Sequence, residues 1–517
     1  MTRGQIALLV ALGATVLAVY VLLGLLVAGR IPIGLPPAPT DMPVPTPTLT
    51  PAPGMSRQNP MPFGETIATD SMEIHVLEVH RHANAFISPL NSPIPDGHEV
   101  VVVNVEVHNR GTAPISLSPG TFRLTGDRAV LYQRPPLLLD NELRGELAPG
   151  ESRSGYLAFV VADGEDNLAL AFIPSGSMSD EGARWLWADP EPNPQAFAVQ
   201  GVAPTASPRT GGSRLNPALM RQPAVADDQL EISVLAVQRD AWPVIREMSP
   251  LNQPPEPDKE YVLVRLRVRF VGQMDQLLSV NWWAFRMTGA DNILYPNPSL
   301  ILTDELKGDL FPTGTLEGNL AFQVRRGEEN LILAYDPSGV GVKIGRGVRW
   351  FWATETPNLD LLKMPVRASA ALPASGRSSQ QPAPIGVPVL SDGQIEITVE
   401  DAVLLPDDAS TWDRWTLPVP EPGRHYVVVT VVARNLAPEE RPQAIHWDGF
   451  LLHEPAGASV YKPTVLGGSE LDGDAFTGAT LRAYLVFQVA GGQRFILSYD
   501  PAGLGNTTSY RWFAIEL

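Results

Sequence analysis

The sequence predicts an all-β protein in which three tandem antiparallel β-sandwiches follow one N-terminal transmembrane helix. Three observations lead to this prediction. A valine-rich stretch with period-two alternation occurs three times, starting at Glu99, Glu260 and His425. A short Arg-Trp stretch follows each of them after a similar interval, and the chain opens on a long uncharged run.

The uncharged run covers residues 6–28 and is long enough to cross a bilayer as a helix. A cleaved signal peptide is the alternative, but such peptides have apolar regions of about 7–15 residues and a small-residue cleavage site. Residues 31–58 are rich in Pro and Thr, which favours an extended, semi-rigid spacer. We therefore expect residues 1–30 to be a single-pass anchor in the cell membrane, with a stalk over 31–58 and the domains on the outer face.

The valine-rich stretches have the pattern of strands that are half-buried on a core. The second one is the clearest, because apolar residues occupy one face and mostly arginines the other. Its apolar face is Val262, Val264, Leu266 and Val268, and its other face is Leu263, Arg265, Arg267 and Arg269. A strand with one polar face is typical of antiparallel sheets.

Other short apolar stretches return in the same order in each copy, separated by Gly, Pro and Asp turns. Matching positions lie about 160 residues apart, which fits whole domains in tandem better than the units of a solenoid. About seven short strands in each copy, with almost no helical periodicity, predict a β-sandwich. The expected domains cover 59–189, 217–355 and 384–517, joined by Pro-, Ser-, Ala- and Gly-rich linkers over 190–216 and 356–383.

The first copy carries the most specific motifs. Residues 59–64 read NPMPFG, the valine-rich strand ends at Asn109, and residues 147–161 follow the pattern L-x-P-G-E-x-x-x-G-x-L-x-F-x-V. These motifs resemble the telokin-like, immunoglobulin-like domain of unknown function found on bacterial surface lipoproteins and membrane-anchored proteins. The domain is similar in outline to the mycobacterial immunoprotective extracellular antigen. The resemblance implies an Ig-like sandwich, and this family has no agreed catalytic residues. The second copy departs from the pattern, with Phe270 at the strand end and Thr313-Gly314 at the turn.

The composition excludes several kinds of chemistry. The formal net charge of −18 repels phosphate backbones, so nucleic acid is not expected as a partner. There is no cysteine, which excludes disulfides, zinc–thiolate sites and thiol nucleophiles. No motif for phosphate, dinucleotide or serine-nucleophile chemistry occurs, so no cofactor is expected.

Reactive side chains do not recur well among the copies. No histidine is shared by all three, and the pair His80 and His82 is a weak candidate for a metal site. The motif E-L-x-G-[DE] does recur, and its third occurrence holds the best candidates for a weak calcium loop: Glu470, Asp472 and Asp474. A turn with solvated acids is the favoured reading, because two carboxylates are too few for calcium and basic residues interrupt the other occurrences.

Tryptophans are the remaining candidates for binding. Three lie in the loops before the valine-rich strands and two open the next strand, in this order: Trp242, Trp412, Trp415, Trp282 and Trp447. Such side chains can stack on sugars or anchor a protein partner. The alternative, which we favour, is that they cover the open end of each sandwich.

The Arg-Trp stretches at Arg184, Arg349 and Arg511 are expected to be domain-closing strands. We expect each tryptophan to pack into or over the sandwich, and the arginine stem to cover apolar surface with its head in water. Exposed platforms for a ligand at Trp185, Trp350 and Trp512 are the alternative.

These observations predict a non-catalytic protein for binding, adhesion or scaffolding at the bacterial envelope, with a protein or glycan partner and a bilayer contact through residues 6–28. Carbohydrate-binding modules that use the loop tryptophans are one alternative. A hydrolase confined to the third copy, around Glu470, Asp472, Asp474 and His446, is another, and a purely structural spacer is a third. Loss of activity in an isolated third copy on Glu470→Ala would identify the hydrolase.

Overall fold

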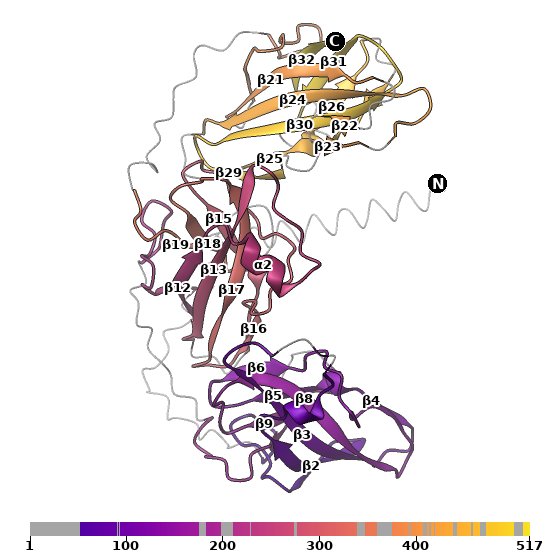
Figure 1. The fold of residues 1–517 in the computed structure, drawn as a ribbon, viewed down its shortest axis with the longest axis vertical. Coiled ribbons are helices and arrows are strands. Elements are labelled where there is room, and N and C mark those ends of the chain that lie inside the picture. Colours follow the sequence, from indigo (N-terminus) through magenta and orange to yellow (C-terminus); the bar gives the residue numbers. More distant parts are fainter. Residues whose placement is uncertain are drawn as a thin grey trace, which may run out of the picture. The chain divides into compact units, whose positions relative to one another are not determined.

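Antiparallel strands dominate the structure, as the alternating pattern predicts (Figure 1). The computed structural model describes residues 52–517, apart from residues 90, 92–93, 175–181, 198–209, 228, 273–276, 339–346, 359–374, 392–393, 407–410, 413–414, 418, 438–441, 456–458, 466–471 and 501–509. The predicted membrane helix over residues 6–28 and most of the predicted stalk lie outside the described residues. Within them, no helix is both long and apolar enough to span a bilayer.

The first segment, which we define as residues 52–197, contains two main sheets. Strands β1, β2, β3 and β8 form one sheet in that order, and β10, β9, β5 and β6 form the other. A third, small sheet pairs β4 with β7. The elements are β1 Thr66–Ala68, β2 Met72–His80, η1 Asn84–Phe86, β3 His98–Asn109, β4 Ile115–Leu117, η2 Pro119–Thr121, β5 Phe122–Thr125, β6 Val130–Gln133, β7 Gly145–Leu147, β8 Ser152–Ala162, β9 Ala169–Phe172 and β10 Arg184–Trp187.

The second segment, residues 210–358, repeats this order with β11, β12, β13 and β17 in one sheet and β15, β18 and β19 in the other. Strand β16 pairs with both β14 and β6, so the second sheet of the first segment continues into this segment. The elements are β11 Ala224–Ala226, β12 Leu230–Gln238, α2 Trp242–Met248, β13 Lys259–Phe270, β14 Leu278–Val280, η3 Trp282–Ala284, β15 Phe285–Thr288, β16 Gly308–Leu310, β17 Thr315–Arg325, β18 Ile332–Tyr335 and β19 Arg349–Trp352.

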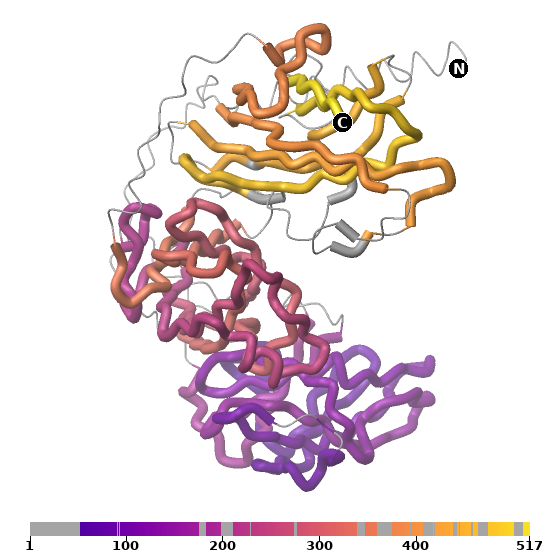
Figure 2. Tube along the Cα trace, turned by 45° about the horizontal axis from the view of Figure 1, so that its top comes forward, coloured from indigo at the N-terminus to yellow at the C-terminus, as the bar shows by residue number. Residues whose placement is uncertain are grey.

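The third segment, residues 375–517, has the sheet β20-β21-β24-β30-β28 and the sheet β27-β26-β31-β32. Its long strands β21, β24 and β30 run side by side (Figures 1 and 2). The elements are β20 Val389–Leu390, β21 Ile395–Leu404, β22 Thr411–Trp412, β23 Trp415–Thr416, β24 His425–Asn435, β25 Gln443–His446, η5 Trp447–Gly449, β26 Phe450–His453, β27 Val460–Tyr461, β28 Thr464–Val465, β29 Asp472–Ala475, β30 Thr480–Val489, β31 Arg494–Tyr499 and β32 Arg511–Glu516.

The predicted valine-rich strands are β3, β13 and β24, and their predicted apolar faces are fully buried. In β13, Val262, Val264, Leu266 and Val268 lie in the core against residues of the facing sheet such as Leu333. Each preceding strand has a bulge at the same place, between Val76 and Glu78 in β2, Val234 and Ala236 in β12, and Val399 and Asp401 in β21. Because a bulge bends the strand that contains it, the shared position indicates that the three segments have the same backbone path here.

The closing strands are β10, β19 and β32, and Trp185 and Trp350 pack over the sandwich, as expected. The residue that directly follows the first Trp of the strand, such as Leu186 or Phe351, enters the core between the sheets. Trp185 and Trp350 lie on the outer side of this sheet, where they are 4% and 6% exposed. They are therefore packed over the sandwich and are not exposed platforms, whereas Trp512 is only partly buried.

In two of these strands the arginine differs from the expectation that its head lies in water. The Nε of Arg349 donates to the Val225 carbonyl oxygen at 2.6 Å, and the Nε of Arg511 donates to the Leu390 carbonyl oxygen at 2.6 Å. Val225 and Leu390 lie in β11 and β20, the first strands of the opposite sheets. The guanidinium thus ties the closing strand of one sheet to the edge strand of the other.

Two buried glutamates occupy matching places in the first two segments. Glu165 accepts hydrogen bonds from the Tyr132 hydroxyl at 2.7 Å and from the Arg128 backbone N–H at 3.0 Å. Glu328 accepts from the Tyr295 hydroxyl at 3.0 Å and from the Asp291 N–H at 2.8 Å. Burial raises the pKa of Glu165 to about 7 and that of Glu328 to about 8.

Candidate ligand-binding pocket in the second segment

The candidate site lies where β14 ends and the short helix η3 begins. Trp282 and Trp283 open this helix, and their side chains are 37% and 46% exposed. The two indole rings meet edge to face, with ring centroids 6.0 Å apart. A large apolar ring that stays exposed in water is a candidate contact for a ligand.

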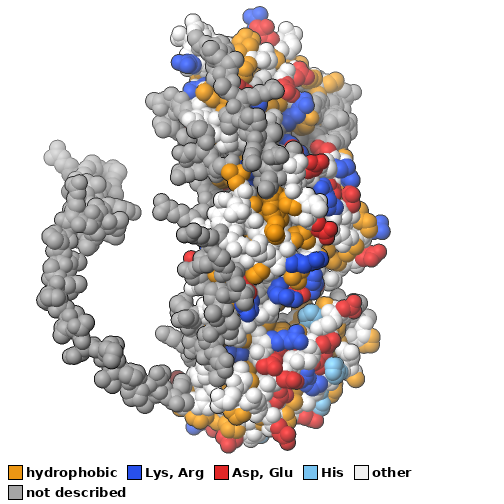
Figure 3. All heavy atoms as spheres, turned by 90° about the vertical axis from the view of Figure 1, so that its left-hand side faces the viewer, with side chains coloured by type: hydrophobic (Ala, Val, Ile, Leu, Met, Phe, Trp, Pro, Cys, Tyr) orange, Lys and Arg blue, Asp and Glu red, His pale blue; other side chains and the backbone are white. Residues whose placement is uncertain are grey.

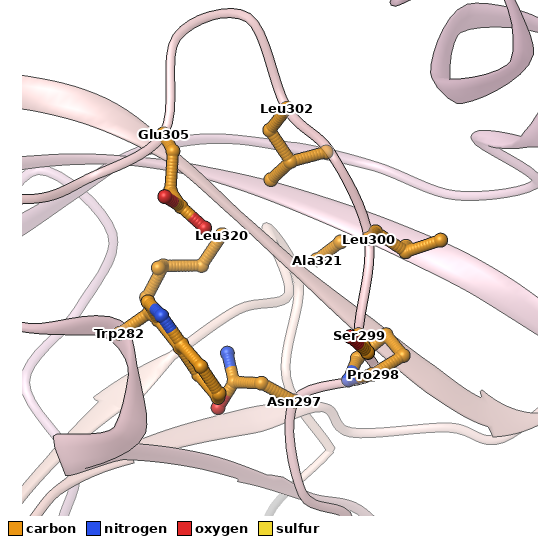
Figure 4. A pocket seen from close by; sticks show the side chains of 9 residues that line it. All are labelled: Trp282, Asn297, Pro298, Ser299, Leu300, Leu302, Glu305, Leu320 and Ala321. Atoms are coloured by element: carbon orange, nitrogen blue, oxygen red, sulfur yellow. The ribbon is translucent and has the colours of Figure 1, made fainter. Parts of the chain in front are cut away.

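Trp282 forms one wall of a cavity of about 110 Å³ (Figure 4). The other lining residues come from the 297–305 loop and from β17: Asn297, Pro298, Ser299, Leu300, Leu302, Glu305, Leu320 and Ala321. The cavity therefore combines an aromatic wall and leucines with a few polar groups, which is a usual composition for a binding site. Its volume is well below the roughly 300–1,000 Å³ of sites for drug-sized ligands, so it suits one side chain or the edge of one sugar ring.

The 297–305 loop is held in place by buried amides. Asn252 is 7% exposed; its side-chain nitrogen donates to the Ile301 carbonyl at 3.0 Å and its oxygen accepts from the Ile301 N–H at 2.8 Å. Asn297, with its amide nitrogen turned toward them, donates to the carbonyls of Trp282 at 3.2 Å and Phe285 at 2.7 Å. Together these bonds fix the loop against η3, so the cavity is already formed without a ligand.

Two further exposed apolar side chains lie next in sequence to residues that line the cavity or hold its loop. Ile301 lies between the two lining leucines and is 50% exposed, and Leu251, beside Asn252, is 72% exposed. We call the cavity, its wall residue Trp282 and the nearby exposed residues Trp283, Leu251 and Ile301 the aromatic mouth. Scattered apolar residues on a surface need no explanation, but several around a preformed cavity mark an interaction site.

Trp242 does not line the cavity but packs against residues that do. It opens α2, lies 6.2 Å from the Tyr261 ring and packs in the cluster that includes Leu300, Leu302 and Ala321. The structure therefore brings together two of the tryptophans named from the sequence, one as a support and one as a wall.

The other predicted tryptophans lie in the third segment. Trp447 opens η5, the counterpart of η3, and packs against the core. Trp412 and Trp415 are direct partners in the two-stranded ribbon β22–β23. Covering of the sandwich, the favoured reading, fits Trp242 and Trp447 but not Trp282.

The recurring motif E-L-x-G-[DE] has a structural explanation. Its leucine is buried in the core, as Leu143 and Leu306 show, and the following Gly145 and Gly308 have positive φ. A Cβ on Gly318 of the next strand would lie only 2.7 Å from the Leu306 Cα, so that strand needs a glycine at the point of contact. Glu305 of the motif lines the aromatic mouth and pairs with Lys307 at 2.8 Å.

Two of the three calcium candidates lie in a strand. Asp472 and Asp474 lie in strand β29, which pairs with β25 so that Asp472 is opposite His446. Asp474 is 5% exposed, and Glu470 lies outside the described residues. Among the described residues, no three His, Asp or Glu side chains are grouped as metal ligands would be, which also applies to His80 and His82.

A larger cavity of about 390 Å³ lies beside the mouth, between β6 and the 302–309 stretch. Most of its acidic side chains are already paired: Arg265 binds Asp304 at 2.6 Å and Glu317 at 3.4 Å, and Lys307 binds Glu305 at 2.8 Å. The fourth, Asp309, accepts hydrogen bonds from Ser279 and Gln133. On the face drawn in Figure 3, acidic and basic side chains are likewise interspersed. Neutralised acids make this cavity a weaker candidate than the mouth for binding a cation or a basic ligand.

The fold and these contacts define an all-β protein of antiparallel sheets packed as β-sandwiches. Residues 61–184, which cover most of the first segment, are a domain of the family described as "Domain of unknown function (DUF4352)". The resemblance inferred from the motifs of the first copy is thereby confirmed. Among curated proteins, none matches the chain.

Several solved structures are similar to part of the chain. The yjhA protein from Bacillus subtilis is 21% identical, with a TM-score of 0.21, over 25% of this chain and 99% of its own. The ycdA protein from Bacillus subtilis, described as a candidate lipoprotein, is 19% identical, with a TM-score of 0.20, over 25% and 37%. The secreted protein MPT63 from Mycobacterium tuberculosis is 12% identical, with a TM-score of 0.19, over 22% and 86%.

Sequence reasoning named Trp282 but missed the rest of the mouth. Leu251, Asn252, Asn297 and Ile301 belong to no motif and gave no signal in the sequence. The paired tryptophans Trp282-Trp283 were the one available signal, because matching positions in the other segments are Pro119-Gly120 and Trp447-Asp448.

Proposed function

We propose that the protein is a non-catalytic binding protein of the bacterial cell surface, and that the aromatic mouth is its main contact. In this proposal, residues 6–28 anchor the chain in the membrane and three Ig-like domains over 59–189, 217–355 and 384–517 carry the binding surface outside. The observation that carries the proposal is a preformed cavity walled by the exposed Trp282, whose ring contacts the exposed Trp283.

The recurring residues support the non-catalytic part of the proposal, because they pack in the core or form structural hydrogen bonds. The leucines of E-L-x-G-[DE] fill the core, and the closing arginines Arg349 and Arg511 join two sheets. Glu165 and Glu328 each bond a tyrosine and a backbone N–H. Each recurring group thus has a structural partner that accounts for it. What differs between the segments, the aromatic mouth, is suited to contact and not to reaction.

A glycan is the partner that one specific observation favours. Sugar rings pack on tryptophan through their apolar faces, while nearby polar groups select their hydroxyls. The mouth offers the indole of Trp282 beside Ser299, Asn297 and Glu305 (Figure 4). A protein partner would instead insert one apolar side chain into the cavity and cover Ile301 and Leu251.

The test is binding of the full-length chain, purified in detergent, to a glycan array, followed by titration of the best glycan with tryptophan fluorescence. Trp282→Ala is expected to weaken binding about tenfold, because ring contact with an indole supplies up to about 1.5 kcal/mol beyond the area it buries. The matched control is Trp447→Ala, which removes the corresponding tryptophan of the third segment.

Binding that survives Trp282→Ala but is lost in Trp447→Ala would move the site to the third segment and refute the role of the mouth. If no glycan binds, the carbohydrate candidate fails. The mouth would then need a protein partner whose capture depends on Trp282.

A further inference from the structure

The contacts between consecutive segments repeat residue by residue. In each segment, the turn after the E-L-x-G-[DE] motif donates a backbone N–H to the last residue of the valine-rich strand: Gly150 to Asn109, Thr313 to Phe270, and Gly478 to Asn435. The residues two positions before these donors are therefore structural equivalents. They are Ala148, Phe311 and Phe476.

Phe311 and Phe476 each insert into the preceding segment. Phe311 lies 5.8 Å from the Trp185 ring at an interplanar angle of 68°, and Phe476 lies 5.8 Å from the Trp350 ring at 66°. Their backbone N–H groups donate to the Ala129 carbonyl at 2.8 Å and to the Asn292 carbonyl at 2.9 Å. Both rings are almost fully buried, at 4% and 1% exposure.

An arginine covers each phenylalanine from the other side. The Arg57 guanidinium lies 4.4 Å from the Phe311 ring centroid, and that of Arg214 lies 4.5 Å from the Phe476 centroid. Arg57 also donates to the Gly126 carbonyl at 3.0 Å, and Arg214 donates to the Asn292 side-chain oxygen at 2.6 Å. Each phenylalanine is thus held between a tryptophan and an arginine of the preceding segment, an arrangement that combines aromatic and cation–π contacts.

The two ends of the array lack these residues. At the first segment, the equivalent of the phenylalanine is Ala148, which is exposed. At the third segment, the bridge Ser378–Gln381 matches Ser56–Asn59 and Ser213–Asn216, so the equivalent of Arg57 and Arg214 is the exposed Ser379.

The third segment also has polar groups where the tryptophan of the other two meets its phenylalanine. Ser498 pairs across the strands with Trp512, as Ala334 does with Trp350, and its hydroxyl bonds His453 at 2.7 Å. His453 then packs on the Trp512 ring at 5.3 Å. Terminal units of repeat proteins are usually altered in this way, because their outer faces stay in water.

We propose that the second and third segments each dock on the preceding segment through a phenylalanine plug, which fits a socket formed by a tryptophan and an arginine. The first segment has no plug and the third has no complete socket, so the docking surface does not continue beyond them. The partner that fits this surface is the next segment of the same chain. The plug fixes the segments relative to each other, so the aromatic mouth is presented in one orientation. This inference does not depend on what the mouth binds.

The absence of cysteine allows pairs of spin labels to be placed without background. Exposed positions in the three segments are Ser154 in β8, Glu247 in α2 and Glu516 in β32. In the full-length chain, both label pairs, 154–247 and 247–516, are expected to give narrow distance distributions. Phe476→Ala is expected to broaden the 247–516 distribution by at least twofold and to leave the 154–247 distribution unchanged. Phe311→Ala is expected to do the reverse, so each variant is the control for the other.

Distributions that are already broad in the unmodified chain, or that stay narrow in both variants, would overturn the proposal. If Phe311→Ala does not fold, Gly314→Ala tests the same joint, because its Cβ would lie 2.5 Å from the Ala129 carbonyl oxygen. It should broaden only the 154–247 distribution, and an unchanged distribution would again contradict the docking role.

The role of the two terminal segments is tested by giving the first segment a plug and the third segment a socket, so that two chains can dock end to end. The triple variant Ala148→Phe, Ser379→Arg and Ser498→Ala supplies a plug at one end and a socket at the other. Concentration-dependent association in sedimentation velocity is expected for it and not for Ala148→Phe alone. A triple variant that sediments like the unmodified chain would show that these three residues do not cap the array.

Discussion

The second segment contains two pairs of tryptophans, one buried and one exposed to solvent. Trp350 and Trp352 of the closing strand are 6% and 2% exposed, whereas Trp282 and Trp283 of the aromatic mouth are 37% and 46% exposed. The first pair is covered on the outside by Phe476 and other apolar residues. The second pair faces solvent beside an open cavity.

Recurrence along the chain separates Trp350 from Trp283. Trp350 has counterparts in Trp185 and Trp512, at the same place in the closing strand. Trp283 has Gly120 and Asp448 at the matching positions of η2 and η5. A residue that every segment needs serves the common fold, while an exposed aromatic found in one segment only is free to serve a ligand.

The largest expected effect lies on the buried side of this comparison. Trp350→Ala should lower the free energy of unfolding by about 3–5 kcal/mol, because it leaves a cavity where a buried indole packed. Urea unfolding of the full-length chain, followed by circular dichroism, measures the change. The control is Trp283→Ala. A similar loss in both variants would mean that the exposed tryptophan is as structural as the buried one.

A smaller effect is expected at the buried Glu328, and it depends on pH. Asp291 and Tyr295 lie against the Glu328 carboxyl, the Arg239 guanidinium donates to the Glu328 backbone carbonyl, and Arg325 pairs with Asp291. Burial is the main cause of the raised pKa of Glu328. A carboxyl with a raised pKa favours the folded state fully below its unfolded pKa near 4.5, and this contribution is lost as pH rises toward about 8.

Glu328→Gln should therefore make the chain more stable than the unmodified protein above pH 8, by about 2 kcal/mol, and remove part of the pH dependence. Urea unfolding at pH 5 and pH 9 tests this, with the exposed neighbour Glu329→Gln as the control. A stability that rises between these two pH values only in the unmodified chain would contradict the assigned direction of the pKa.

The comparison also shows how far the sequence could lead. Period-two alternation predicted β3, β13 and β24, and recurrence predicted the closing strands, because both follow from local packing that each segment repeats. The roles of Phe311 and Phe476 were out of reach, since a plug is defined by a surface about 120 residues away in sequence. Alignment of Ala148 with these two residues was the one trace of it.

The mouth was visible only through its tryptophans. The cavity depends on a loop held by Asn252 and Asn297, whose hydrogen bonds to backbone groups follow no sequence pattern. In its first two occurrences, the recurrence of the acidic motif reflects the buried leucine and the glycine with positive φ, so the backbone places these carboxylates.

The smallest expected effect is that of Trp283→Ala. With 46% of its side chain exposed and its indole edge resting on Trp282, removal should change the free energy of unfolding by less than about 1 kcal/mol. The tryptophan emission maximum should move to shorter wavelength, because the variant loses an indole that emits from water and keeps those buried at the closing strands. A shift to longer wavelength, or a loss of stability near that of Trp350→Ala, would place Trp283 inside the fold and remove it from the mouth. If both expectations hold and glycan or partner binding weakens as well, the contact extends from the cavity wall at Trp282 to the outer edge of the mouth.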